Sequence, residues 1–402
     1  MRPMRGRLAV LLFVIAVAIA AGFVTRPYVH GASFVVRAAD MAGRVRRVAD
    51  IDTVRVETRE IEIPTTRGPL RARVYEPAGS HRRAALLTSG LHVSGIDEPR
   101  LIRLAHQIAA SHVLVVTPDI PELARFEIAP AITDAIEEAS LWLATESGLA
   151  PDQKVGLMGI SFSGGLSIVA AGRPALANHV AYVFSLGGHD DLPRVLRYLC
   201  TGREPRPVPK VRFASDGHAN DTFVLAPHDY GVAVILLGVA DRAVPPAQAE
   251  RLRRGVRQYL LASALDGGVD KARAPAEFDA VRKYARTLPE PSATLMRYVV
   301  ERDVVHLGAR LLPLLGSGSP GAADALSVSK SPKPSAPVFL LHGLEDNVIP
   351  PVESEYLAED LRGAAPVRLL LSGLISHAEA DRPIRATDML ELSGFWGDLL
   401  AR

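Results

Sequence analysis

Several short segments of the chain are almost entirely apolar. They are AALLT (84–88), HVLVVTP (112–118), KVGLMGI (154–160), AYVFSLG (181–187), PVFLLHG (337–343) and VRLLL (367–371). Such runs are typical of parallel strands that are buried on both faces. Residues 99–110 and 132–147 carry apolar side chains at helical spacing, so strands and helices alternate through the first half of the chain. This alternation predicts a doubly wound, mostly parallel sheet of the α/β class.

Two segments that precede these runs have a different pattern. Residues 53–63 and 70–77 alternate apolar and polar side chains, as half-buried antiparallel strands do. We therefore expect them to form an opening hairpin.

The alternation of strands and helices stops near Gly188 and resumes near Ala336. The segment between them contains helical patterns and closes on a Gly/Ser/Pro-rich stretch that is typical of a linker. We expect residues 191–335 to form an inserted, mostly helical cap that divides the sheet domain into residues 53–190 and 336–402. An insertion after the sixth strand emerges at the edge of the sheet where substrates bind, so the cap should lie over that edge.

The N-terminal region contains a membrane-targeting pattern. Seventeen uncharged residues, 8–24, follow Arg2, Arg5 and Arg7. The length of this run lies between that of a cleaved signal peptide and that of a membrane span. The arginines ahead of the run predict a cytoplasmic N-terminus. We expect residues 1–25 to be a signal anchor or a signal peptide. The protein would then be membrane-anchored with its folded part outside the cytoplasm, or secreted or periplasmic if the segment is cleaved.

Composition and charge narrow the class of protein. Hydrophobic residues make up 48% and charged residues 22% of the chain, as in ordinary globular proteins. The 46 basic and 44 acidic residues leave a net charge of +2, which gives no general field to attract a nucleic acid. The single cysteine, Cys200, can form neither an intrachain disulfide nor a two-cysteine metal or redox motif. We therefore expect no nucleic-acid partner, and the oligomeric state stays open.

The segment VGLMGISFSGG (155–165) joins a predicted strand to an apolar helix. It resembles the nucleophile elbow of the α/β-hydrolase family, in which G-x-S-x-G forces a sharp turn that lifts the serine above the sheet. The resemblance implies Ser161 as the nucleophile, with Gly159 at the end of the strand. Ser163 stands where the family usually has glycine, so Ser163 is an alternative nucleophile that the position of Gly159 disfavours. A glycine-bearing turn with incidental serines is the other alternative.

A serine nucleophile needs a base that takes its proton and an acid that orients the base. The segment PVFLLHGLEDNVIPP (337–351) resembles the family's acid-bearing turn, which implies Asp346 as the acid and leaves Glu345 as its competitor. His377 is the only histidine after His342, and it follows the next predicted strand, where the family places its base. A solvated turn carboxylate and a solvated loop histidine are the alternatives, but the three placements support one another.

Acyl transfer also requires hydrogen-bond donors for the oxyanion. The resemblance implies the backbone N–H of Phe162 as one donor. Residues 84–95 look like the family's loop after its third strand, with Ser89 in place of histidine. The backbone N–H of Leu91 is therefore the best second donor, and that of His92 is a weaker one.

Two polar clusters stand apart from this set. The first comprises His218, Asp221, His228 and Asp229 in the predicted cap, whose spacing matches no metal-binding motif. The second is GGHDD (187–191), after the sixth predicted strand. Its polar residues either line the cleft or form a turn that leads into the cap. We expect no metal and no organic cofactor.

The resemblance to α/β-hydrolases covers residues 53–190 and 336–402. It implies a serine hydrolase that cleaves a carboxylic ester of a small-molecule or lipid-like acyl substrate. Ser161 would attack the carbonyl, His377 would carry the proton and Asp346 would orient the imidazole. Because fold and triad do not fix the substrate, acyl transfer and peptide hydrolysis are alternatives, as is a membrane-anchored scaffold without turnover.

Overall fold

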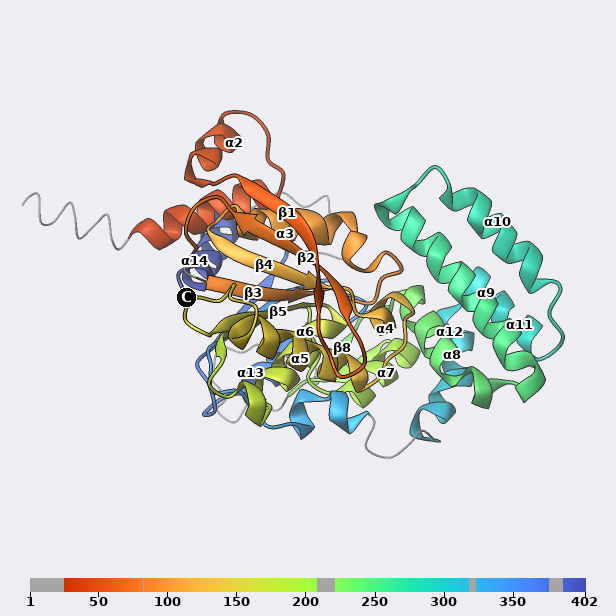
Figure 1. Cartoon of the computed structure of the whole chain (residues 1–402). Helices are drawn as coiled ribbons and strands as arrows, with labels where there is room; N and C mark the ends of the chain where they lie inside the picture. The colour runs from red at the N-terminus through yellow and green to blue at the C-terminus, as the bar shows by residue number, and fades with distance from the viewer. Residues whose placement is uncertain (1–24, 82, 208–220, 318–322, 376–385) are drawn as a thin grey trace, which may run out of the picture.

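A mostly parallel sheet forms the centre of the protein (Figure 1). The computed structural model describes residues 25–81, 83–207, 221–317, 323–375 and 386–402. Its eight-stranded sheet has the order β1-β2-β4-β3-β5-β6-β9-β10. The strands are β1 (Val56–Ile63), β2 (Leu70–Pro77), β3 (Arg83–Thr88), β4 (Val113–Pro118), β5 (Val155–Ile160), β6 (Val180–Leu186), β9 (Val338–Gly343) and β10 (Val367–Ser372).

Strand directions agree with the sequence patterns. β1 pairs with β2, and β2 with β4, in antiparallel fashion, and the other neighbours in the sheet pair in parallel. Along β3, Ala84 and Leu86 pack on one face of the sheet while Ala85 and Leu87 pack on the other. Successive side chains of a strand point to opposite faces, so burial of both faces explains the unbroken apolar runs. The predicted hairpin and the predicted parallel sheet are confirmed.

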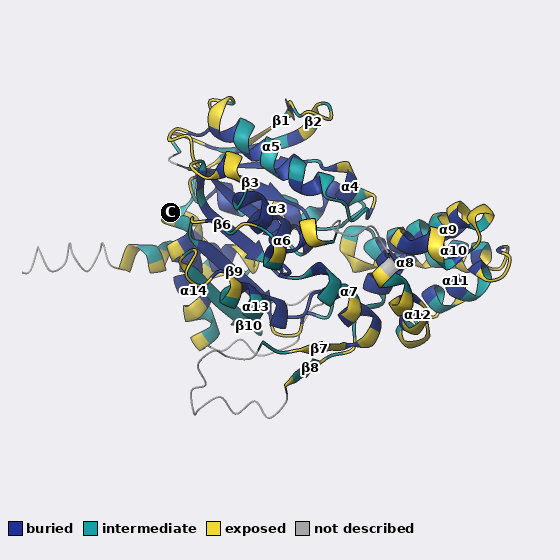
Figure 2. Cartoon of the chain, turned by 90° about the horizontal axis from the view of Figure 1, so that it is seen from below, coloured by how far each residue is buried: buried dark blue, intermediate teal, exposed yellow. Residues whose placement is uncertain are grey.

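Helices cover both faces of the sheet, whose central strands β3, β4, β5, β6 and β9 are largely buried (Figure 2). One face packs against α5 (Ala131–Thr145), α6 (Phe162–Ala171) and α13 (Val352–Asp360). The other packs against α3 (Pro99–Ala109), α14 (Ala386–Leu400) and a helix over residues 25–38. The short helix α4 (Pro121–Ala124) follows β4. This is the layered arrangement expected of a doubly wound sheet.

The helix over residues 25–38 is part of the folded core. Phe34 is fully buried and packs against Trp396 of α14, with ring centroids 4.1 Å apart. A side chain on Gly31 would meet the backbone of Ser393, so glycine is what allows these two helices to touch. The helix α2 (Arg44–Ala49) folds back onto the helix over residues 25–38, where Ser33 donates a hydrogen bond of 2.8 Å to the carbonyl of Ala49.

Between β6 and β9 the chain forms a second apolar core. It comprises α7 (Leu192–Thr201), α8 (Asp229–Ala243), α9 (Pro246–Ala264), α10 (Ala274–Ala285), α11 (Ser292–Val300) and α12 (Val304–Leu311), with the strand pair β7 (Arg203–Pro205) and β8 (Thr222–Val224). In α9, Leu252, Val256 and Tyr259 recur at helical spacing and are buried. Most of this helical part extends beyond the carboxyl ends of the parallel strands (Figure 1). We call residues 191–335 the cap.

The predicted signal or anchor, residues 8–24, lies outside the described residues. Within the part of the chain that the structure describes, no helix is long and apolar enough to cross a membrane. The role of residues 1–25 therefore stays a prediction.

Candidate active site

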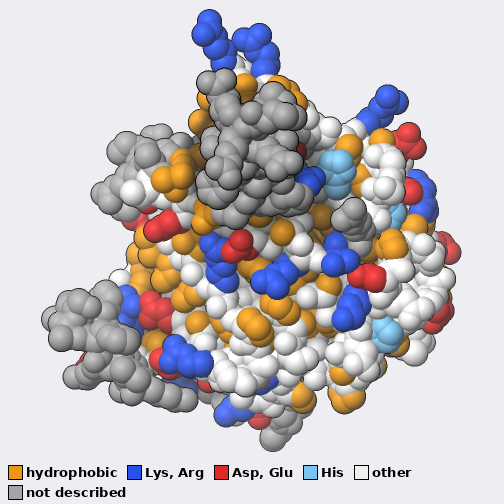
Figure 3. Space-filling model, turned by 90° about the vertical axis from the view of Figure 1, so that its left-hand side faces the viewer, with side chains coloured by type: hydrophobic (Ala, Val, Ile, Leu, Met, Phe, Trp, Pro, Cys, Tyr) orange, Lys and Arg blue, Asp and Glu red, His pale blue; other side chains and the backbone are white. Residues whose placement is uncertain are grey.

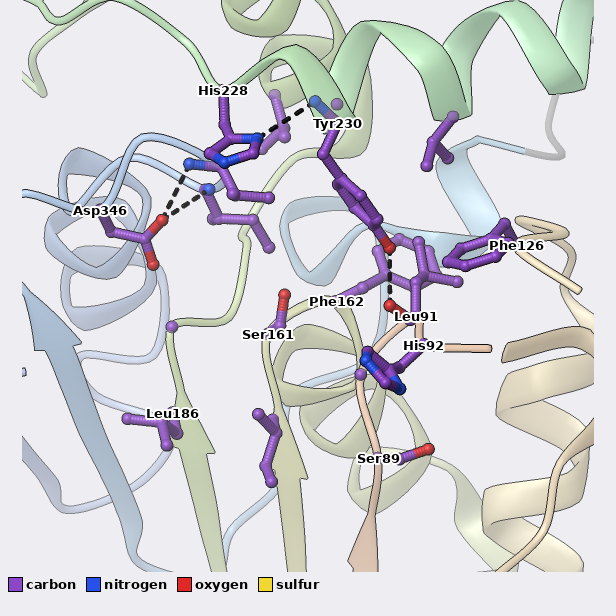
Figure 4. A pocket seen from close by; sticks show the side chains of 18 of the residues that line it. Ser89, Leu91, His92, Phe126, Ser161, Phe162, Leu186, His228, Tyr230 and Asp346 are labelled. Carbon is purple, nitrogen blue, oxygen red and sulfur yellow. Dashed lines mark hydrogen bonds between the residues drawn. The ribbon is translucent and has the colours of Figure 1, made fainter. Parts of the chain in front are cut away.

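Ser161 is the single residue between β5 and α6. Its backbone has φ 55° and ψ −128°, a conformation that residues other than glycine seldom adopt. Gly159 permits the turn, because a Cβ there would lie 2.1 Å from the carbonyl oxygen of Ser163. The Ser161 hydroxyl points into the pocket, between Asp346 and the loop that carries Leu91 and His92 (Figure 4).

Ser163 has a different environment. Its side chain is fully buried, and its hydroxyl donates a hydrogen bond of 2.5 Å to the carbonyl of Ser89. A buried hydroxyl that is committed to a backbone carbonyl is poorly placed to attack a substrate. The geometry favours Ser161 as the nucleophile, while Ser163 ties the elbow to the loop after β3.

The predicted oxyanion donors are two backbone N–H groups near Ser161. Phe162 is the first residue of α6, where a helix leaves its N–H groups without an intrahelical acceptor. Within the described residues, the Leu91 N–H donates no hydrogen bond. The His92 N–H instead donates to the carbonyl of Leu123 at 3.2 Å. The geometry therefore favours Leu91, the first choice, over the weaker alternative His92.

Asp346 is buried in the turn after β9 and lines the same pocket as Ser161. Its Oδ1 accepts hydrogen bonds from the N–H groups of Val348 at 2.9 Å and Ile349 at 3.1 Å (Figure 4). These bonds and its burial contradict the alternative of a solvated turn carboxylate. The competing Glu345 is exposed.

His342 supports this turn from within the core. It is fully buried, with Nδ1 2.6 Å from the Ser354 hydroxyl and Nε2 2.8 Å from the carbonyl oxygen of Ile349. The Nε2 donor therefore holds the end of the turn that carries Asp346, whose Oδ2 lies 3.5 Å away. This placement gives the histidine of the H-G motif a structural role.

His377, the predicted base, lies outside the described residues. Ile375, the last described residue before it, lines the pocket together with Ser161 and Asp346. Two described histidines also line this pocket, His92 and His228. Each already accepts a backbone N–H at Nδ1, from Ser94 at 3.2 Å for His92 and from Tyr230 at 3.1 Å for His228. The identity of the base stays a prediction.

The pocket has a volume of about 400 Å³ and a largely apolar wall. The cap supplies Val195, Leu196 and Leu199 from α7 and Val234 and Ile235 from α8, and the loop after α4 supplies Phe126 and Ile128. The lining extends to Ser263 and Ala264 at the end of α9. Glu98 and Arg100, at the start of α3, are charged residues of the wall. Such a site suits a substrate that is apolar over most of its surface.

The segment GGHDD forms a turn that joins the sheet to the cap, as one of the two interpretations predicted. His189 is fully buried behind the elbow, where its ring stacks on Phe162 with centroids 4.9 Å apart. The guanidinium of Arg194 contacts three buried carboxyl groups, those of Asp190 at 3.0 Å, Glu353 at 2.5 Å and Glu204 at 3.4 Å. None of the residues of this buried acidic cluster lines the pocket.

The acidic cluster predicts a pH-dependent stability. Burial and the neighbouring Glu353 raise the pKa of Glu204 to about 10. Its contribution to stability is therefore full below the pKa of the unfolded chain, near 4.5, and is lost as pH rises towards 10. Glutamine stays neutral, so Glu204→Gln should raise Tm at pH 9 by roughly 2–4 °C relative to the wild type and change it little at pH 5. Thermal unfolding at both pH values measures this difference, and equal shifts at the two would contradict it.

The polar residues of the cap have structural partners. His228 caps the start of α8, and Asp229 accepts a hydrogen bond from the Tyr259 hydroxyl. His218 lies outside the described residues, and no group of His, Cys, Asp or Glu within the described ranges could hold a metal ion.

Tyr230 was not predicted from the sequence. This residue comes from α8 of the cap, lines the pocket and donates a hydrogen bond of 2.6 Å to the carbonyl of Leu91. No local motif marks it, because its partner is 139 residues away in the chain.

Comparison with known proteins shows similarity only to solved structures. No protein-family model matches the sequence, and no curated protein matches it either. Among solved structures, the chain is similar to a hyperthermophilic esterase from the archaeon Pyrobaculum calidifontis, with 17% identity over 88% of this chain and 84% of that one and a TM-score of 0.39. It is also similar to EstE1, a thermostable carboxylesterase from a metagenomic library, with 16% identity over 87% and 85% of the two chains and a TM-score of 0.41. An acylaminoacyl peptidase from Pyrococcus horikoshii shares 11% identity over 84% of this chain and 40% of that one, with a TM-score of 0.39.

These identities and scores are low, so the fold assignment rests on the chain itself. The strand order places two antiparallel strands at one edge and continues as a parallel sheet through β4, β3, β5, β6, β9 and β10. The strained serine follows β5, the buried aspartate follows β9, and the helical insertion follows β6. With this arrangement, the chain has the α/β-hydrolase fold.

Proposed function

We propose that this protein is a serine hydrolase that cleaves carboxylic esters with an apolar acyl group. The observation that carries the proposal is the placement of Ser161 on a strained turn in an apolar pocket that also contains Asp346. A strained turn of this kind holds the hydroxyl free of the helix and the sheet.

The proposed reaction has two halves. The Oγ of Ser161 bonds to the ester carbonyl carbon while His377 takes the hydroxyl proton. The N–H groups of Phe162 and Leu91 stabilise the oxyanion that forms. His377 then gives the proton to the departing alcohol, which leaves an acyl-enzyme. Water, deprotonated by the same histidine, releases the acid and restores Ser161. Asp346 orients the imidazole and stabilises its charged form.

The apolar wall favours esters over the alternatives. A peptide substrate would bring several backbone N–H and C=O groups into a pocket that offers few polar partners, and unpaired polar groups are costly to bury. Acyl transfer to an alcohol other than water uses the same groups and would be detected as a product that depends on an acceptor.

Two measurements on the purified full chain test the proposal. A fluorophosphonate probe should label Ser161, as identified by peptide mass spectrometry, and p-nitrophenyl esters of graded acyl length should be hydrolysed. A well-folded protein that neither reacts with the probe nor hydrolyses any ester would instead support the non-catalytic scaffold.

The cap should determine the acyl length that the pocket accepts. Ala264 lines the pocket at the end of α9, and a phenylalanine there would fill part of the space available to an acyl chain. Ala264→Phe should lower kcat/KM for the longest accepted ester about tenfold and leave that for the acetyl ester within about twofold. The matched control is Val305→Phe, at a position on α12 that is 77% exposed. Equal effects of the two substitutions across the ester series would contradict this role of the cap.

We also propose that residues 1–25 hold the protein at a membrane, with the folded part outside the cytoplasm. The support is the apolar run at 8–24 and the arginines that precede it. The helix over residues 25–38 and the cap helices α8 to α12 lie at opposite ends of the molecule (Figure 1). A chain anchored through this helix would therefore turn its pocket away from the bilayer. The face at the anchored end carries side chains of both charges mixed with apolar ones (Figure 3).

Fractionation of cells that express the full chain tests this location. The protein should sediment with membranes, and a protease added to the outer compartment should digest its folded part. Recovery of the full-length chain in the cytosolic fraction would contradict the proposal.

A further inference from the structure

The loop after β3 is held at two of its peptide groups. The carbonyl of Ser89 accepts the hydroxyl of Ser163 at 2.5 Å. The carbonyl of Leu91 accepts the hydroxyl of Tyr230 at 2.6 Å, and the N–H of His92, which belongs to the same peptide group, donates to Leu123 at 3.2 Å. The Leu91–His92 peptide is therefore fixed at both its oxygen and its nitrogen.

The peptide group between these two joins Gly90 to Leu91, and it lies beside the nucleophile. A Cβ on Gly90 would be 3.3 Å from the Cβ of Ser161 and 3.3 Å from the carbonyl oxygen of Ile160. Its N–H, that of Leu91, is the second oxyanion donor of the proposed reaction. Because a peptide group is planar and its neighbours are held, the direction of this N–H depends on the hydrogen bonds on either side.

One of these flanking bonds comes from the cap. Tyr230 lies in the first turn of α8, and its ring packs edge-on against Phe126 with centroids 5.9 Å apart. The residue that caps this helix, His228, donates its backbone N–H to the carbonyl of Asn347 at 2.9 Å, next to Asp346. The start of α8 thus contacts both the oxyanion loop and the acid-bearing turn. Burial raises the pKa of Tyr230, so its hydroxyl stays a neutral donor.

We propose that Tyr230 is a positioning residue through which the cap fixes the Leu91 N–H for oxyanion stabilisation. The inference rests on the proposed hydrolase function and gives the cap a part in the chemistry, in addition to its part in substrate selection. An N–H that is already aimed at the developing charge stabilises the transition state without reorganisation, whereas a loop free to rotate stabilises it less. The effect should therefore appear in kcat, because the substrate carbonyl carries little of this charge before reaction.

Steady-state ester hydrolysis by Tyr230→Phe in the full chain tests the proposal. The substitution removes one hydroxyl and keeps the ring against Phe126, and kcat should fall about tenfold while KM stays within about twofold. The matched control is Tyr259→Phe, because Tyr259 is also a buried cap tyrosine whose hydroxyl bonds elsewhere, to Asp229. That control should keep the kcat of the wild type. A second variant, Ser163→Ala, releases the other flanking peptide and should lower kcat in the same way.

Hydrogen exchange separates this inference from the hydrolase proposal, because it needs no activity. Amide exchange of the peptide that contains residues 89–92, followed by mass spectrometry, should be faster in Tyr230→Phe than in the wild type and unchanged in Tyr259→Phe. Equal exchange in the two variants would overturn the positioning role whether or not the protein is an esterase. A kcat in Tyr230→Phe equal to that of Tyr259→Phe, or a loss confined to KM, would overturn it as well. A wild type without ester hydrolysis or phosphonate labelling would overturn only the hydrolase proposal.

Discussion

Replacement of Ser161 by alanine should reduce kcat for ester hydrolysis by at least about 10³-fold. The reason is that the substitution removes the atom that would bond to the acyl carbon, while the pocket and the oxyanion donors stay in place. Labelling by a fluorophosphonate probe should disappear together with turnover. Because one hydroxyl is removed from a turn that already holds a side chain, Tm should change little.

Ser163→Ala is the matched control for this experiment. Ser163 has the same side chain two positions later, but its hydroxyl is buried against the carbonyl of Ser89. Its loss should lower kcat only about tenfold through the loop, and Ser161 should still be labelled. The opposite result, with Ser161→Ala active and Ser163→Ala inactive, would mean that Ser163 is the nucleophile.

The strands of the sheet could be predicted because the pattern that marks them lies within a few consecutive residues. Each strand of the parallel part is buried on both faces, as the side chains of Ala84, Ala85, Leu86 and Leu87 show for β3, so the apolar run itself marks the strand. The elbow could be predicted for a similar reason. The close approach of Ser163 to Gly159 lies within five consecutive residues, so a short motif contains the whole constraint.

Contacts between distant parts of the chain could not be predicted in this way. Residues 25–38 gave no strand or motif signal, because their helix is stabilised by Phe34 and Gly31 against α14 at the other end of the chain. The role of Ser163 depends on Ser89, 74 residues earlier, and Arg194 pairs with Glu353, 159 residues later. In each case the two residues are far apart in the sequence, so no local pattern indicates that they interact.

The candidate site also contains residues that could be predicted from the sequence and residues that could not. Asp346 could be predicted because residues 337–351 resemble the family's acid-bearing turn, and the structure places its buried side chain in the same pocket as Ser161. The resemblance already ranked Leu91 ahead of His92, but the reason that the structure adds could not be predicted, because it is the hydrogen bond from the His92 N–H to the carbonyl of Leu123. The cap residue Tyr230 could not be predicted either, because its partner Leu91 is 139 residues away in the chain.

His377→Ala should abolish activity to the same degree as Ser161→Ala, at least about 10³-fold in kcat. A base must be neutral to accept the serine proton, so activity of the wild type should fall through a single ionisation as pH drops through the ordinary imidazole range, about 6–7. A variant without this base should lose both the rate and the ionisation. The pH profile of kcat/KM therefore distinguishes loss of the base from general damage to the loop.

The two other histidines of the pocket supply the controls. Burial lowers the pKa of His92 and one of its ring nitrogens accepts the Ser94 N–H, while His228 caps α8. His92→Ala and His228→Ala remove these local contacts and should lower kcat moderately, but each should keep the ionisation of the wild type. If the ionisation persisted in His377→Ala and vanished in one of these two, that residue would be the base. The proton would then leave Ser161 towards the oxyanion loop or the cap, and Asp346 would no longer have an imidazole to orient.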